Sequence, residues 1–326
     1  MTDHAASSAA PTLTSASWRD YVQLLKPRVM SLVVFTALTG LVCARSPMNP
    51  ILAAVAILCI AVGAGGSAAL NMAYDGDIDA VMRRTRARPV PSGRVQAADA
   101  LALGVALSLF SVALMGLAIN WLSAGLLAAT IAFYAVAYTL WLKRRTPQNI
   151  VIGGFAGALP PLVGWAAASG TTPLNAWLLV AIIFVWTPPH FWALSLYTRE
   201  DYAKAGVPMM PVVKGAASTR RQILAYSLAL VPLCVAPAFT GLGGAVYLGV
   251  AVGGGAVFLL LASRLASSRA GDLAADRADD GDLYAVRAAS APARNLFAFS
   301  ILYLFLLFAA LLGEHLMNLA PLRWPQ

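Results

Sequence analysis

The sequence has few charged residues and few cysteines, and its first residues include no Lys or Arg. Only 11% of its 326 residues are charged, against about 25% in a typical soluble domain, which excludes an ordinary soluble protein. The three cysteines lie far apart in apolar stretches, so neither a disulfide framework nor a zinc site is indicated. The first 17 residues contain no Arg or Lys, which excludes a secretory leader and an arginine-rich transit peptide. We expect residues 1–17 to be a disordered cytosolic tail.

Apolar residues make up 60% of the chain, and the mean hydropathy is +0.73. They recur in runs of about 20 residues, each long enough to cross a hydrocarbon core as a helix. We therefore predict an all-α integral membrane protein with about nine transmembrane helices. Residues 18–314 form its membrane domain, and 315–326 form a short C-terminal tail. The predicted spans are 28–45, 50–72, 96–118, 121–141, 148–168, 175–197, 222–241, 243–263 and 294–314.

The basic residues concentrate in alternate links between these spans, and the net charge is +9. They precede the first span and follow the second, fourth, sixth and eighth. Because cytoplasmic loops collect Lys and Arg, we predict a cytoplasmic N-terminus and a periplasmic C-terminus in a bacterial inner membrane. The same spread argues against a nucleic-acid partner. The loop 265–293 mixes Asp and Arg and is predicted to be a solvated segment without a catalytic role.

An acid-rich stretch closes the second span. Asn71, Asp75 and Asp79 are spaced i, i+4, i+8, so on a helix they share one face, while Asp77 points roughly the other way. An Asp near bilayer depth costs about 2.5–3.5 kcal/mol and normally faces a cavity or a partner. Two carboxylates and an amide on one face suit Mg²⁺, which binds oxygen ligands together with substrate phosphates. The alternative is a helix end that is simply wet.

A second acid-rich stretch, "REDYAK" (199–204), closes the sixth span. It lies four spans after the first, which predicts two parallel four-helix halves with a ninth helix appended. Asp201 is the candidate metal ligand or diphosphate-network residue here. Lys204 is a candidate diphosphate contact, and its alternative is a solvated loop cation.

Two pairs of cations are further candidates for the site. Arg84 and Arg88 follow the first acid-rich stretch, and Lys143 and Arg144 end the fourth span. Arg suits bidentate recognition of phosphate, so acids that hold a metal beside these cations describe a diphosphate site. The alternative for each cation is orientation in the membrane. Asn149, at the start of the fifth span, is either a helix cap or a polar site residue.

His190 lies in "WTPPHFW", where Pro188 and Pro189 are expected to break the sixth span. A lone His in an apolar region is either a packing residue or, here, a ligand for a bound group. His4 and His315 are read as incidental. Five aromatic residues could flank a cation or a flat ring, although packing is the simpler role for each: Trp165, Trp186, Phe191, Trp192 and Tyr197.

The run NxxxDxxxD at Asn71–Asp79, followed by "MRRTRARP", resembles the first aspartate-rich motif of the UbiA superfamily of intramembrane prenyltransferases. Three further stretches resemble the protohaem IX farnesyltransferases (haem O synthases) within it. They are "YTLWLKRRTPQNIVIGGFAGALPPLVGWAAASG" (138–170), "WTPPHFWALSLYTREDYAKAGVPMMPVVKG" (186–215) and "NLFAFSILYLFLLFAALL" (295–312). The second acid-rich motif departs from the usual run of aspartates, because Tyr202 replaces an acid.

This resemblance implies Mg²⁺-assisted ionisation of farnesyl diphosphate and attack on the allylic cation by a vinyl group of haem B, which is the acceptor substrate. Asn71, Asp75, Asp79 and Asp201 would hold the metal, the cations named above would hold diphosphate, and His190 would contact haem. A haem A synthase or oxidase assembly factors would be possible partners. Two alternatives remain at this stage: a UbiA relative with another aromatic or chlorin acceptor, and a cation-coupled transporter, which would carry its acids in the middle of the spans.

Overall fold

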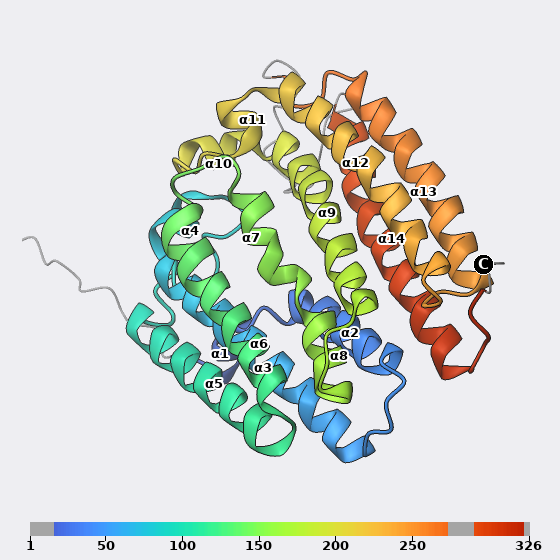
Figure 1. Cartoon of the computed structure of the whole chain (residues 1–326). Coiled ribbons are helices and arrows are strands. Elements are labelled where there is room, and N and C mark those ends of the chain that lie inside the picture. The colour runs from blue at the N-terminus through green and yellow to red at the C-terminus, as the bar shows by residue number, and fades with distance from the viewer. Residues whose placement is uncertain (1–15, 273–289, 323–326) are drawn as a thin grey trace, which may run out of the picture.

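The computed structural model describes residues 16–272 and 290–322, and every regular element within them is a helix (Figure 1). Most of the predicted cytosolic tail, residues 273–289 of the predicted solvated loop, and the last four residues lie outside the described residues. The elements are α1 (Trp18–Leu24), α2 (Pro27–Cys43), α3 (Pro50–Tyr74), α4 (Gly76–Val81), α5 (Ala97–Ala118), α6 (Trp121–Ala132), the π-helix η1 (Phe133–Leu142), α7 (Asn149–Ala158), α8 (Pro160–Ser169), α9 (Leu174–Tyr197), α10 (Arg199–Lys204), α11 (Met210–Val213), α12 (Ala216–Phe239), α13 (Ala245–Ala266) and α14 (Ala291–Leu316).

The prediction of about nine spans is confirmed in the described part of the chain. Eight spans there are long and apolar enough to cross a membrane, and a ninth is counted if α1 and α2, which meet at a bend of 50°, form one span. Local signals fix several ends. Pro50 occupies the first turn of α3, and the Asn49 side chain accepts a hydrogen bond from the Ile51 N–H at 2.8 Å, a typical helix start.

Two predicted spans differ in their interior. The fifth is two helices, because Pro160 and Pro161 lack the N–H groups that would continue α7. The expected break before His190 is wrong, since α9 runs unbroken through Pro188 and Pro189. Packing against other helices lets a membrane helix tolerate proline, but burial does not distinguish this span from the fifth, because both are buried to the same extent.

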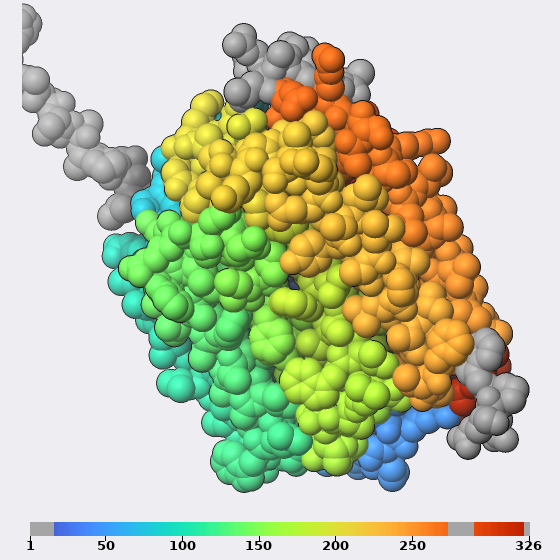
Figure 2. All heavy atoms as spheres, turned by 45° about the horizontal axis from the view of Figure 1, so that its top comes forward, coloured from blue at the N-terminus to red at the C-terminus, as the bar shows by residue number. Residues whose placement is uncertain are grey.

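The long helix α9 lies in the middle of the bundle, with α7 and α8 on one side and α12 and α14 on the other (Figure 1). The largest apolar cluster fills this region and includes Trp192, Tyr303 and Phe308. In Figure 2 the yellow segment around α10 and α11 lies at one end of the molecule, between the green and the orange helices. The proposed duplication into two four-helix halves stays a prediction.

Candidate active site

The first acid-rich stretch lies where α3 passes into α4. The chain bends at Asp75 (φ −86°, ψ 9°), but backbone hydrogen bonds keep the helical spacing: Asp75 N–H donates to Asn71 O at 3.0 Å and Asp79 N–H to Asp75 O at 2.8 Å. Asn71, Asp75 and Asp79 are buried, with 4%, 0% and 2% of their surface exposed. The Asp77 side chain is 64% exposed. The three buried residues form a carboxylate cluster on one face.

Cations from two other segments reach these acids. Lys143 Nζ forms an ion pair with Asp75 Oδ2, and Arg88 Nη1 lies 2.6 Å from Asp79 Oδ2. The Arg144 guanidinium donates two 2.7 Å hydrogen bonds to Asp77, which lowers the pKa of that carboxyl below its usual value. The structure therefore brings the first-motif acids and the end of the fourth span together.

A hydrogen-bond network joins the cluster to α2 and η1. Asn71 Nδ2 donates to Asp75 Oδ2 at 2.6 Å and to Thr139 Oγ1 at 3.1 Å, and Lys26 Nζ donates to Asn71 Oδ1 at 2.7 Å. Every hydrogen-bonding atom of the Asn71 amide group is thereby engaged, which fixes the orientation of the amide. Sequence reasoning missed both Lys26 and Thr139. Lys26 was read as an orientation signal, and a lone Thr in an apolar span gives no signal.

The π-helix η1 explains how Thr139 and Lys143 reach the cluster. Thr139 Oγ1 donates to Tyr134 O at 2.8 Å, and the Lys143 N–H donates to Tyr138 O at 2.9 Å, both five residues back along the chain. Such wide turns are rare and frequently lie at functional sites. Periodicity arguments assume an α-helix, so they could not predict which way the side chains of Thr139 and Lys143 point.

Asp75 Oδ1 is the atom from which the suitability of the site for a metal ion can be judged. Asp75 Oδ1 is buried and accepts no hydrogen bond from any described residue, and Arg144 Nη2 is 3.9 Å away from it. A buried carboxylate oxygen without a donor is a favourable ligand for a hard cation. Within residues 16–272 and 290–322, however, no three His, Cys, Asp or Glu side chains converge as a ready metal cage. The residues present fit a cation shared with substrate phosphates.

The second acid-rich stretch, on α10, packs beside α4. Tyr202 joins Ile78, Met82 and Ile150 in one small apolar cluster, so the residue that replaces an acid anchors α10 to the first motif. Asp201 is half-buried and Lys204 is exposed. Neither side chain forms an ion pair or hydrogen bond with a described residue, and the same holds for the exposed Arg84. The roles predicted for these three residues stay predictions.

Asn149 is not a helix cap. The N-cap of α7 is Gln148, and the fully buried Asn149 side chain donates from Nδ2 to Lys143 O at 3.2 Å. Its Oδ1 is buried and receives no hydrogen bond from a described residue. Asn149 therefore fastens the segment that carries Lys143.

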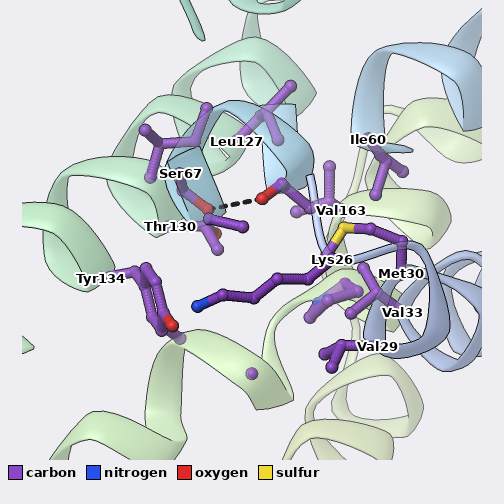
Figure 3. A pocket seen from close by; sticks show the side chains of 16 residues that line it. Lys26, Val29, Met30, Val33, Ile60, Ser67, Leu127, Thr130, Tyr134 and Val163 are labelled. Carbon is purple, nitrogen blue, oxygen red and sulfur yellow. Dashed lines mark hydrogen bonds between the residues drawn. The ribbon is translucent and has the colours of Figure 1, made fainter. Parts of the chain in front are cut away.

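An apolar pocket of about 130 Å³ is lined by Lys26 (Figure 3), whose ammonium also donates to Asn71 of the cluster. We call the end of the pocket that is lined by Lys26, Ser67 and Tyr134 its mouth. Val33, Ile60 and Leu127 line the pocket seven positions away from these three residues in the chain, which is about 10 Å along a helix at 1.5 Å per residue. Ile60 and Leu127 belong to a packed apolar cluster that closes this end. The pocket is a blind apolar slot with a charged mouth.

His190 lies on α9, buried and away from this pocket. Its ring stacks between Trp186, at 4.2 Å, and Phe297, at 4.7 Å. The Ser300 hydroxyl donates to Phe297 O at 2.6 Å, so at its 2.7 Å contact with His190 it accepts from Nδ1–H. The neutral ring then carries its lone pair on Nε2. Of the other predicted aromatic residues, Trp165 and Trp192 are packed in the core.

Comparison with known proteins agrees with this fold. The chain belongs to the UbiA prenyltransferase family, whose sequence model matches residues 33–278. It is thus an intramembrane prenyltransferase. Within the family it groups with the protohaem IX farnesyltransferases: it is 67% identical to the one from Caulobacter sp. (strain K31), over 95% of this chain and 93% of that protein. It is 60% identical to the one from Maricaulis maris (strain MCS10), over 96% and 94%.

Solved structures confirm the fold. A structure of a digeranylgeranylglyceryl phosphate synthase superposes with a TM-score of 0.72 at 15% identity and covers 92% of this chain and 98% of its own. A UbiA homologue from Archaeoglobus fulgidus bound to GPP and Mg²⁺ gives a TM-score of 0.57 at 16% identity, over 90% and 99%. At these identities the likeness establishes the shared helical architecture alone.

Proposed function

We propose that this chain transfers the farnesyl group of farnesyl diphosphate to a vinyl group of haem B, giving haem O and diphosphate. The observation that carries the proposal is the placement of a buried carboxylate cluster, ringed by cations, at the mouth of a blind apolar pocket. A prenyl diphosphate has the same two parts, an anionic head and an apolar tail. The acids lie at the end of α3 beside arginines, and this position does not suit the ion path of a transporter.

The diphosphate head would lie against the carboxylate cluster. Asp75, Asp79 and Asn71 would hold Mg²⁺, with Asp201 approaching from α10, and the ion would supply positive charge to the departing diphosphate. Lys143, Arg88 and Arg144 already contact the acids and are placed to bind phosphate oxygens, and Arg84 and Lys204 are the further candidates. Ionisation breaks the C1–O bond and leaves its electron pair on the diphosphate, so cations held in place beforehand lower the barrier.

The farnesyl tail would occupy the apolar pocket. Lining residues such as Val33, Ile60 and Leu127 offer no hydrogen bond, so water gains little by entering. Exclusion of water protects an allylic cation until the vinyl carbon attacks it. Water then adds to the resulting haem-side cation and releases a proton, which completes the hydroxyethylfarnesyl group. We place this site at the cytoplasmic face of a bacterial inner membrane.

The test is product mass. Purified protein in lipid nanodiscs is incubated with haem B, farnesyl diphosphate and Mg²⁺, and we expect a porphyrin heavier by farnesyl plus water. Asp75→Asn keeps the shape of the side chain but removes the charge, and we expect a loss of roughly 100-fold in rate or more with haem binding retained. Asp99→Asn is the matched control, because Asp99 is exposed in the first turn of α5; its rate should stay within a few fold. An unchanged porphyrin mass with the wild type would refute the proposed activity.

A further inference from the structure

Lys26 adopts a backbone conformation that a lysine rarely takes. Its φ of 51° and ψ of 60° place it in the left-handed region, at the bend between α1 and α2. Such a conformation costs a non-glycine residue on the order of 1–3 kcal/mol, and it clusters at functional sites where the surroundings enforce it. Unlike Asn or Asp, lysine has no short polar group to stabilise it locally. Backbone hydrogen bonds hold the bend, from Lys26 N–H to Gln23 O at 3.1 Å and from Val29 N–H to Lys26 O at 2.9 Å, and the side chain adds a further contact.

The side chain crosses the pocket mouth. Its aliphatic stem lines the apolar pocket, and in Figure 3 its ammonium points toward Tyr134. Nζ donates to Asn71 Oδ1 at 2.7 Å. An ammonium has three N–H donors, and in the described part of the chain the other two meet no acceptor. The ammonium of Lys26 therefore lies between the carboxylate cluster and the apolar pocket, with two N–H donors that no described residue accepts.

This boundary is where the reacting bond must lie. If the diphosphate rests on the cluster and the tail fills the pocket, the C1–O bond that joins them passes the pocket mouth. Lys143 and Arg88 contact acids of the cluster and Arg144 contacts the exposed Asp77, whereas Lys26 alone among these cations also lines the pocket. A cation at this point acts on charge that appears only as the bond breaks.

We propose that Lys26 is a catalytic residue whose ammonium donates a hydrogen bond to the bridging oxygen of the prenyl diphosphate. The C1–O bond breaks, its electron pair becomes a lone pair on that oxygen, and Lys26 stays protonated while it stabilises the new charge. The proposal rests on the proposed function, because it assumes a prenyl diphosphate in this site.

The main variant is Lys26→Met, which keeps the apolar stem and removes the charge. We expect kcat to fall by roughly 100-fold, with KM for farnesyl diphosphate changed only a few fold. Arg28→Met is the matched control, since Arg28 follows two residues later and is exposed; it should retain the wild-type kcat. Lys26→Gln keeps a hydrogen-bond donor toward Asn71, so it serves if Lys26→Met does not fold, and it should be similarly slow.

A second substrate separates chemistry from structure. In farnesyl S-thiolodiphosphate the bridging atom is sulfur, a poor hydrogen-bond acceptor, so the gap in kcat between wild type and Lys26→Met should shrink severalfold. An equal gap with both substrates, or full kcat in both Lys26 variants, would overturn the proposal. Failure of the wild type to make haem O would instead refute the proposed function. Haem O production by the wild type together with a fast Lys26→Met refutes only the role of Lys26.

Discussion

At the scale of single residues, the site is a network of acidic and basic side chains joined by the Asn71 amide. Asp75 and Asp79 share one network with the basic residues Lys26, Arg88 and Lys143. Basic side chains gathered at one point favour binding of a multiply charged anion. Asn71 connects the parts, because its amide contacts both the cation of α2 and the carboxylate of Asp75.

The sequence predicted the acids and most of the cations of this network but not all of it. Spacing alone places Asp75 and Asp79 on one face, and neighbouring arginines mark a phosphate site. Lys26 meets Asn71 across 45 positions of chain, and its role depends on a bend and a left-handed backbone that no local pattern encodes. The number of ligands from α10 is also beyond the sequence, since it depends on how α10 packs.

We predict that His190 acts through Nε2, whose lone pair is left available by the Ser300 contact. His190→Phe keeps the stacking on Trp186 and Phe297 but removes the nitrogen. We expect the Soret band of bound haem B to shift from its wild-type position and haem O production to fall about 10-fold or more. Tyr226→Phe, in the same core but paired with Trp192, is the control. An unchanged Soret band in His190→Phe would make His190 a packing residue.

At the scale of elements, the close contact of α2 with α8 sets the walls of the pocket. A Cβ on Gly164 would overlap the carbonyl oxygen of Ala37, and one on Gly40 would overlap that of Pro161. Small residues that let backbones approach are typical of membrane helix interfaces.

Span limits were well predicted because they follow from apolar length. The break at Leu159 and the continuity of α9 were not, since each span carries a buried pair of prolines and neither the local sequence nor burial separates the two cases.

Gly164→Ala should therefore push α2 and α8 apart. Forced packing of this kind costs about 1–3 kcal/mol, and we expect a lower unfolding midpoint in a thermal or denaturant titration, with slower prenyl transfer. Gly253→Ala is the control, because a Cβ there meets no atom within 4 Å. Equal midpoints for the two variants would contradict the close-contact interpretation.

At the scale of the whole molecule, the charged site lies at one end of a bundle whose other spans present apolar side chains outward. Leu109, Phe110 and Leu117 on α5, for example, are 68%, 59% and 78% exposed, as expected for a surface in lipid. The basic links predict that the end bearing the site faces the cytoplasm.

The orientation of the protein in the membrane can be measured by cysteine labelling in intact spheroplasts. Ala87→Cys lies in the exposed loop after α4, and Met317→Cys follows α14 with 72% exposure. The three native cysteines are buried and give little background. We expect a membrane-impermeant maleimide to label Met317→Cys at once and Ala87→Cys only after lysis. The opposite pattern would reverse the topology.

The wide turns of η1 carry a consequence for the ancestry of the fold. A π-helical segment is what an ordinary helix becomes when an extra residue is inserted and the flanking turns keep their places. The segment Phe133–Leu142 could therefore gain a residue without turning the helix that follows it. In an ordinary α-helix the same residue would turn every later side chain by about 100°, and Lys143 would no longer face the first acid-rich motif.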